Sequence, residues 1–364
     1  MRYHYMDSAR AIFMILGVFY HTALIYSTSE VWLVKGEELN AFFDYLSYVM
    51  HLFRMQGFYI VAGFFAAMLI EKKGAKNFLH ERLIRLGIPM LTIGFTLNYF
   101  MNEWSTASPV LTTGWTYFLN GDWVGHLWFL GNLIVYIAIT AIFILKKKNT
   151  LHAIFEFFAQ TSKKYFILKF ILVCFFFYSV GHIITVNLAD KIFFIEIPAL
   201  FKYFPFYVLG YLFYFNRQIL EGIVNYQKLK YHIFLSIAIL LFMSKLFIFH
   251  KEVFFIKLLS FVLEIYLSII LSLSIILIFK SIKLFNNSNT TVRKLSDSSY
   301  SIYLLHQPFI VGFFHVFNEQ IRDPVLGFIL VSLSTTIFAY FLHVYFIKRY
   351  QIASLLLNGS YLKT

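Results

Sequence analysis

Long apolar segments recur along the whole chain, and they constrain its fold more than any other feature. A helix needs about 20 predominantly apolar residues to cross a bilayer. Ten segments come near that length, at residues 9–27, 46–70, 84–101, 126–145, 166–186, 200–215, 232–249, 254–279, 298–317 and 325–347. Because lipid offers no partners to backbone polar groups, these segments are expected to be helices. The sequence therefore predicts one all-α polytopic integral membrane domain over residues 1–364, with about ten transmembrane helices.

Composition excludes several other classes of protein. Only 13% of the residues are charged and 60% are hydrophobic, whereas soluble proteins average about a quarter charged residues. The single Cys174 lies in an apolar segment, which excludes a disulfide framework and a cysteine-based metal site, so we expect no metal site. The net charge of +13 does not indicate a nucleic-acid partner, because the basic residues lie in alternate loops. The lipid bilayer is the expected surrounding.

The distribution of positive charge between loops predicts the orientation in the membrane. Basic residues gather in every second loop: Lys72, Lys73, Lys76, Arg82, Lys146, Lys147, Lys148, Lys163, Lys164, Arg217, Lys228, Lys230, Lys280, Lys283, Arg293 and Lys294. Loops rich in Lys and Arg stay in the cytoplasm. Arg2 and Arg10 near the N-terminus, and Lys348, Arg349 and Lys363 near the C-terminus, place both termini there. An even number of crossings satisfies this orientation.

Three ionisable residues, Asp7, Arg10 and His21, interrupt the first apolar segment. Each helical residue turns about 100°, so eleven residues bring Arg10 and His21 within roughly 20° of the same face. Asp7 is too far from His21 to touch it and is expected to pair with Arg10, one turn away. Ionisable side chains inside a bilayer cost at least a few kcal/mol each unless they are paired or wetted. This stripe therefore predicts a polar cavity between helices.

Further arginines lie on the helices that follow. Arg82 and Arg85 are three residues apart, ahead of Pro89, and share one helical face. They are either anchors that reach lipid headgroups or, with Arg10, a clamp for an anionic ligand, since guanidinium groups bind phosphate in a bidentate manner. Arg54 lies several residues inside the second segment, where an anchoring role is harder to defend.

Histidines supply the candidate reactive groups. His306 lies near the middle of the ninth segment, and Pro308 leaves a backbone carbonyl beside it without its helical partner. His306 is either reactive or a hydrogen-bonded link between helices. His21, with His51, Arg54 or His306 nearby, is the predicted reactive centre, because the pKa of histidine lies near neutrality. About 16 Å separate Arg10 from His21 along the helix. This distance is comparable to the extended pantetheine arm of an acyl-coenzyme A, which the arginines could hold by its phosphates while its thioester reaches His21.

Other ionisable residues fit this picture less well. Glu264, in the eighth segment, has no evident partner in the sequence. His182, His315 and His343 lie close to the ends of segments, where interfacial positions are expected for them.

Four motifs in order resemble a known family. They are the Arg10 and His21 pair, Arg82 and Arg85 ahead of Pro89, His126-Leu127-Trp128-Phe129-Leu130, and Tyr300-Ser301-Ile302-Tyr303-Leu304-Leu305-His306. Together they resemble the membrane acyltransferase-3 family, and residues 5–92 are most similar to its glucan-biosynthesis branch. Each motif alone is weak, but their order along nearly the whole chain is specific.

The resemblance implies a ten-helix, multi-pass enzyme of the bacterial inner membrane. Such an enzyme moves an acyl group from cytoplasmic acyl-CoA (succinyl-CoA or acetyl-CoA) to a periplasmic glucan or related envelope glycan. In this branch the group is succinyl, and no cofactor is permanently bound. The predicted catalytic residues are His21, Arg10, Arg54 and His306, and those that hold the coenzyme are Arg82, Arg85 and Arg10. Three alternatives stay open: O-acetylation of another surface polysaccharide, a glycan exporter or flippase, and a non-catalytic assembly partner.

Overall fold

The computed structural model describes residues 3–105, 114–160, 166–216, 229–249, 254–282, 285 and 290–360, and these are almost entirely helical. The long helices are α1 (His4–Tyr26), α2 (Ala41–Lys73), α3 (Ala75–Phe95), α6 (Trp128–Gln160), α7 (Phe166–Asn187), α8 (Ile197–Phe215), α10 (Leu229–Phe249), α11 (Phe254–Ser281), α13 (Thr290–Phe317) and α14 (Pro324–Leu342). The short elements are α4 (Leu97–Glu103), α5 (Trp115–Leu119), the 3₁₀-helix η1 (Asp122–Leu127), the π-helix η4 (His343–Ile347) and α15 (Gln351–Asn358). A small antiparallel hairpin, β1 (Lys191–Ile192) and β2 (Ile195–Glu196), pairs Lys191 with Glu196 and Ile192 with Ile195.

Every predicted apolar segment coincides with a helix, which confirms the all-α, polytopic prediction. Among the described residues, seven helical stretches are long and apolar enough to cross a membrane: His4–Tyr26, Ala41–Lys73, Ala75–Glu103, Asp122–Lys146, Phe166–Asn187, Phe255–Ser281 and Pro324–Ile347. The other three predicted segments correspond to α8, α10 and α13. The count of ten crossings therefore stays a prediction. The turn at residues 250–252 and the loop bases Arg2, Lys163, Lys164, Arg217, Lys228, Lys283 and Lys363 lie outside the described residues.

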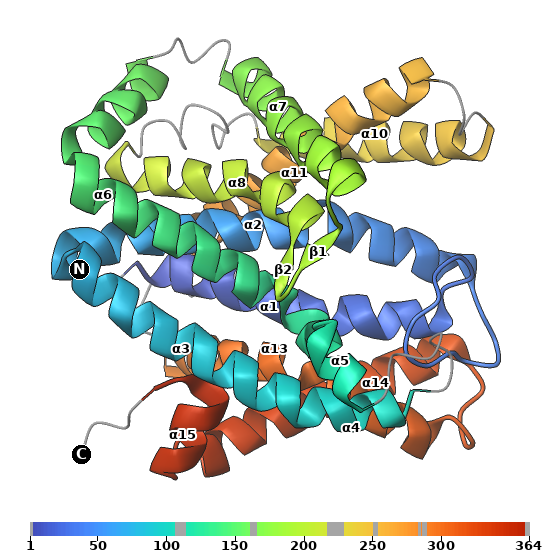
Figure 1. Cartoon of the computed structure of the whole chain (residues 1–364). Coiled ribbons are helices and arrows are strands. Elements are labelled where there is room, and N and C mark those ends of the chain that lie inside the picture. Colours follow the sequence, from blue (N-terminus) through green and yellow to red (C-terminus); the bar gives the residue numbers. More distant parts are fainter. Residues whose placement is uncertain are drawn as a thin grey trace.

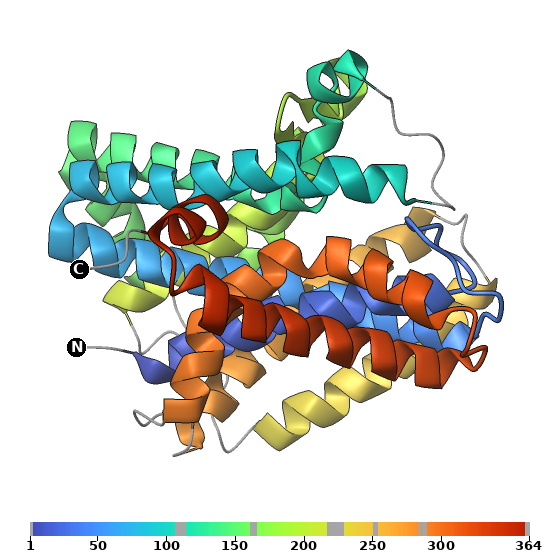
Figure 2. The same cartoon turned by 90° about the horizontal axis from the view of Figure 1, so that it is seen from below.

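The helices lie side by side around α1, which runs through the middle of the bundle. Helix α2 packs on one side of α1, and α13 and α14 pack on the other (Figures 1 and 2). Helices α8 and α11 cover the outer face of α2, and α7 and α10 pack on them in turn. The beginning of α1 and the last helix, α15, lie at the same end of the bundle (Figures 1 and 2). We call this end, where α1 begins, the arginine end, and the opposite one, where α1 ends, the histidine end.

Glycines allow α2 and α8 to cross closely. A Cβ at Gly63 of α2 would collide with the backbone oxygen of Tyr207 on α8, and a Cβ at Gly210 of α8 would collide with that of Ile60 on α2. Small residues let helix backbones approach in this way, which increases van der Waals contact where lipid provides no hydrophobic driving force. The crossing fixes the position of α8 against α2.

His343, near the end of the last predicted segment, is buried between helices. Its side chain is only 1% exposed, and its Nδ1 lies 2.8 Å from the Ser301 hydroxyl. The residue begins the π-helix η4. Its position relative to the membrane interface stays a prediction.

Candidate active site

One face of α1 links all parts of the candidate site. Arg10, Met14, Gly17 and His21 follow one another at intervals of four, three and four residues, so they form a continuous stripe. Arg10 and Met14 line a cavity at the arginine end, and His21 belongs to a cluster of histidines at the other end. The sequence-predicted stripe thus faces other helices along its length.

The cavity is where the three predicted anion-binding arginines meet. It lies between α1, α2, α3, α6 and α13. Arg10, Arg82 and Arg85 all contribute to its wall, together with Met14, Phe58, Ala62, Phe65, Ala66, Phe78, Leu86, Leu130, Leu133, Ile137 and Tyr300. Its lining is therefore cationic in one part and apolar elsewhere. Such a combination suits a ligand with anionic groups and a less polar arm.

Each of these arginines lies over an aromatic ring. The guanidinium carbon of Arg10 is 5.4 Å from the centre of the Phe65 ring, and that of Arg85 is 5.8 Å from the centre of the Tyr300 ring. Arg82 is 5.9 Å from the Phe78 ring centre. Such contacts orient a guanidinium group without neutralising its charge.

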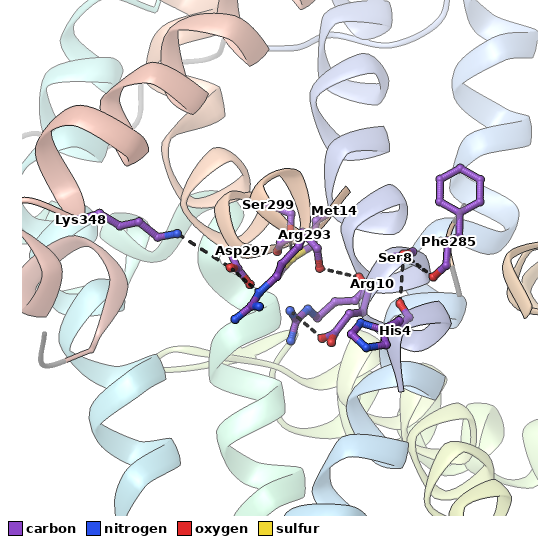
Figure 3. A network of polar contacts seen from close by, with 11 residues as sticks. His4, Ser8, Arg10, Met14, Phe285, Arg293, Asp297, Ser299 and Lys348 are labelled. Atoms are coloured by element: carbon purple, nitrogen blue, oxygen red, sulfur yellow. Dashed lines mark hydrogen bonds and ion pairs between the residues drawn. The ribbon is translucent and has the colours of Figure 1, made fainter. Parts of the chain in front are cut away.

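The arginine end also carries a network of ion pairs. Arg10 Nη2 lies 3.2 Å from Asp7 Oδ1, which confirms the predicted pairing. Beside it, Asp297 lies 4.0 Å from Arg293 and 3.9 Å from Lys348 (Figure 3). The Ser296 hydroxyl donates to the carbonyl oxygen of Asp7 at 2.9 Å. The beginning of α13 is thereby fixed to the beginning of α1.

Pro89 explains how Arg85 is held. In a helix the carbonyl of residue 85 would accept the N–H of residue 89, and proline has none. The Tyr300 hydroxyl donates to this carbonyl instead, at 3.0 Å. On the other side, Gly359 has a φ of +59° and approaches the Arg85 backbone so closely that a Cβ would lie 2.5 Å from the Arg85 Cα. Helix α13 and the residue after α15 therefore both fix the backbone that carries this guanidinium.

Three histidines from three helices meet at the histidine end. The ring centres of His21 and His306 are 5.1 Å apart, and so are those of His306 and His126. The amide nitrogen of Gln307 lies 3.2 Å from both ring nitrogens of His21. His306 is fully buried and His126 is only 5% exposed. His21 therefore faces other polar groups rather than the outside of the bundle.

Pro308 and Gly125 together position His126. Proline at 308 leaves the carbonyl of Leu304 without its helical partner, and His126 Nε2 lies 3.1 Å from that oxygen. Gly125 has a φ of +44° and a ψ of −127°, which kinks η1 directly before His126, and His126 lies against α13. The sequence predicted that Pro308 leaves a backbone carbonyl without its helical partner. This carbonyl, of Leu304, accepts a hydrogen bond from His126.

The hydrogen bonds of His126 and His306 fix their tautomers. A carbonyl oxygen can only accept, so Nε2 of His126 and Nδ1 of His306, which bonds to the Tyr303 carbonyl, each carry the proton. His126 Nδ1 and His306 Nε2 are buried and have no hydrogen-bond partner among the residues that the structure describes. Each neutral ring thus keeps one lone pair free to accept a proton.

Arg54 is a buried cation beside the histidines. Its side chain is 3% exposed, and its guanidinium carbon is 4.4 Å from the centre of the Tyr20 ring. Within the described part of the chain, its Nε and Nη1 have no hydrogen-bond partner. A Cβ at Gly17 would lie 2.8 Å from Arg54 Nη1 and 2.5 Å from Cε2 of Tyr303. Only glycine at this position lets both side chains lie against α1.

Aromatic rings connect the cavity with the histidines. Phe58, which lines the cavity, lies 5.5 Å from Phe129, and Phe129 lies 4.7 Å from Tyr303 between ring centres. Tyr303 is in turn 4.8 Å from His306. On the other side of the cluster, Trp32 stacks on His21 with 5.7 Å between ring centres. The histidines are thus flanked by aromatic rings on both sides.

The structure groups the predicted residues as two sets. Arg10, Arg82 and Arg85 share the cavity, and His21, Arg54 and His306 share the histidine cluster. Sequence reasoning did not identify His126 or Gln307 as members of this cluster. Because Pro308 leaves the Leu304 carbonyl without its helical partner, the sequence indicates that another donor is needed. It does not reveal that His126, on another helix, is this donor.

Comparison with known proteins identifies the family. Residues 3–344 match the family model described as "Acyltransferase domain", acyltransferase-3. The chain belongs to the acyltransferase-3 family. The predicted resemblance to this family is thereby confirmed.

Within this family, the chain is similar to proteins that share one name. The chain is 31% identical over 229 residues to glucans biosynthesis protein C of Escherichia coli strain K12, an alignment that covers 58% of each chain. The proteins of the same name from Escherichia coli O1:K1 / APEC and O139:H28 match to the same extent. The chain thus spans 58% of the length of these relatives. No solved structure matches the chain.

Proposed function

We propose that this acyltransferase moves a succinyl group from succinyl-CoA in the cytoplasm to a hydroxyl group of a glucan in the periplasm, across the bacterial inner membrane. The observation that carries the proposal is the placement of the arginine cavity and the histidine cluster along one face of α1. Arg10 lines the cavity and His21 belongs to the cluster. Eleven residues of helix span about 16 Å, the reach of a pantetheine arm.

The donor is assigned to the arginine end, which we place in the cytoplasm. Arg10, Arg82 and Arg85 offer guanidinium groups to the coenzyme's phosphates, because guanidinium and phosphate form paired hydrogen bonds. Met14, Phe58 and the other apolar residues of the cavity provide a surface for the pantetheine arm. For the thioester to reach His21, the rings of Phe129 and Tyr303 must move aside.

The histidine cluster supplies the proton transfers. The acceptor hydroxyl loses its proton, its oxygen forms a C–O bond with the acyl carbon, the C–S bond breaks, and the proton ends on the thiol of CoA. His21 either accepts the hydroxyl proton as general base or carries the acyl group in transit. His306, whose Nε2 is buried and unpartnered 5.1 Å from His21 between ring centres, is placed to pass the proton on.

Arg54 supports succinyl as the transferred group. This buried guanidinium interacts with the side chains of Tyr303 and Tyr20, but its Nε and Nη1 have no hydrogen-bond partner among the described residues. Buried charged donors that stay unpaired are costly, and the free carboxylate of a succinyl group would pair with them. The name of the curated relatives, glucans biosynthesis protein C, supports a glucan as acceptor. O-acetylation of another surface polysaccharide is the second candidate, and the donor comparison below separates the two.

Purified protein in proteoliposomes tests the proposal. Wild type is incubated with succinyl-CoA or acetyl-CoA and a defined glucose oligosaccharide, while free thiol is measured and the sugar is analysed by mass spectrometry. Wild type should release thiol and form the succinyl ester in preference to the acetyl ester. His21→Ala should insert normally and lose both signals, whereas Asn77→Ala, a change on the surface of α3, should retain them. A glycan exporter would release no thiol in any of these samples.

A further inference from the structure

Glu264 gains the partners that the sequence did not reveal. It lies on α11 and is partly buried. The hydroxyl of Tyr48, on α2, donates to its Oε1 at 3.3 Å. Lys202, on α8, lies close enough to Glu264 for an electrostatic interaction. Three helices thus bring an acid, a base and a phenol together inside the bundle.

Lys202 sits on an aromatic surface. Its Nζ is 5.6 Å from the centre of the Tyr203 ring, and Tyr203 stacks on Trp128 with 5.8 Å between ring centres. Tyr203 is buried, whereas Trp128 is partly exposed. We call Tyr48, Trp128, Lys202, Tyr203 and Glu264 the Lys202 cluster.

The Lys202 cluster adjoins the histidines at the histidine end. Lys202 interacts electrostatically with His51 and Tyr20. The ring of Tyr20 lies 5.8 Å from that of His51 and 4.8 Å from that of His21. A ligand held by the cluster would therefore lie one side chain away from His21, on the side opposite the arginine cavity.

The two charges of the cluster are not joined in a direct ion pair. Within the described residues no ion pair within 4.0 Å connects Lys202 to Glu264, although each affects the other electrostatically. Ionisable groups in membrane helices are costly and mark substrate paths when they persist. A pair kept only for stability would be expected to make direct contact, because separated charges recover little of their desolvation cost. Both charged groups therefore keep hydrogen-bonding capacity for a ligand that contacts the two of them.

We propose that the Lys202 cluster is the binding subsite for the acceptor sugar. Sugar hydroxyl groups donate to a carboxylate and accept from an ammonium group, so Glu264, Tyr48 and Lys202 match them in both directions. The partly exposed ring of Trp128 offers a flat apolar surface for the C–H face of a pyranose ring. This inference rests on the proposed function, in which His21 acts on the hydroxyl that the subsite presents.

Steady-state kinetics with a glucose oligosaccharide test the subsite. Glu264→Gln should raise the KM for the oligosaccharide by about tenfold or more, the effect of losing a hydrogen bond to a charged group. The KM for succinyl-CoA, and the slow hydrolysis of succinyl-CoA without sugar, should be unchanged. Glu103→Gln, which alters an exposed acid at the end of α4, is the matched control and should change neither KM.

A double variant separates sugar binding from stability. Replacing a buried charge pair with apolar residues of similar size is often neutral or stabilising, so Lys202→Met with Glu264→Leu should keep the wild-type melting temperature. The subsite predicts that this variant still has the raised KM for the oligosaccharide. A KM within twofold of wild type in the double variant would overturn the inference, even if Glu264→Gln lowers stability. Failure of the proposed function is distinct, because wild type would then release no thiol from succinyl-CoA.

Discussion

The bond between Tyr300 and the Arg85 carbonyl allows a quantitative test of how the arginine cavity is built. The hydroxyl donates at 3.0 Å to a carbonyl that Pro89 deprives of its helical partner. Tyr300→Phe keeps the ring that lies under Arg85 and removes only this donor. A carbonyl left unpaired in a partly buried position costs on the order of 1–3 kcal/mol. We expect a loss of unfolding free energy of that size.

Pro89→Ala provides the compensating change. Alanine at 89 restores the N–H that the Arg85 carbonyl accepts in an uninterrupted helix. In this background the carbonyl keeps a partner when the hydroxyl is removed. The cost of Tyr300→Phe should then fall to about 1 kcal/mol or less, giving a coupling energy of about 1–2 kcal/mol between the two positions.

The assay is reversible unfolding by sodium dodecyl sulfate in mixed micelles, followed by tryptophan fluorescence, for the wild type, both single variants and the double variant. Tyr345→Phe is the control, because its ring is 64% exposed and a substitution there should change stability by less than about 0.5 kcal/mol. An equal cost of Tyr300→Phe in both backgrounds would refute the reasoning. The Arg85 carbonyl would then not depend on Tyr300 for its hydrogen bond.

Two further predictions concern the two halves of the site. Arg82→Ala and Arg85→Ala should each weaken succinyl-CoA affinity by about 1.5–3 kcal/mol per lost hydrogen bond to a charged group, measured by titration calorimetry. Arg293 lies outside the cavity lining, so Arg293→Ala should leave the affinity for succinyl-CoA unchanged. Unchanged affinity in Arg82→Ala and Arg85→Ala would instead favour lipid anchoring as the role of these two arginines. Gly17→Ala should abolish transfer, because its Cβ would displace Tyr303 and Arg54, whereas Gly87→Ala has open space and should stay active in the thiol-release assay. Full activity of Gly17→Ala would show that the packing around Arg54 is not required.

The order of helices and the polar stripe on α1 could be predicted from the sequence. A helix that crosses a bilayer needs about 20 apolar residues, so segments of that length could be recognised in the sequence. Each of these predicted segments coincides with helical structure. Spacing within one helix fixes which residues share a face, and this placed Arg10 with His21 and Arg82 with Arg85. The Asp7 to Arg10 ion pair followed from the same geometry, and its distance of 3.2 Å confirms it. The effect of Pro308 on the Leu304 carbonyl is likewise local.

Contacts between helices were decided only by the tertiary structure. His126 and Leu304 are 178 residues apart, and Tyr48 and Glu264 are 216 residues apart. Helical periodicity gives the face of each residue within its own segment, but in lipid nearly all segments are apolar on every side. Which faces meet depends on close packing at points such as Gly17, Gly63 and Gly210, where a missing side chain admits a neighbour. The sequence by itself determined the polar groups and their positions within each helix, and packing decided which of them act together.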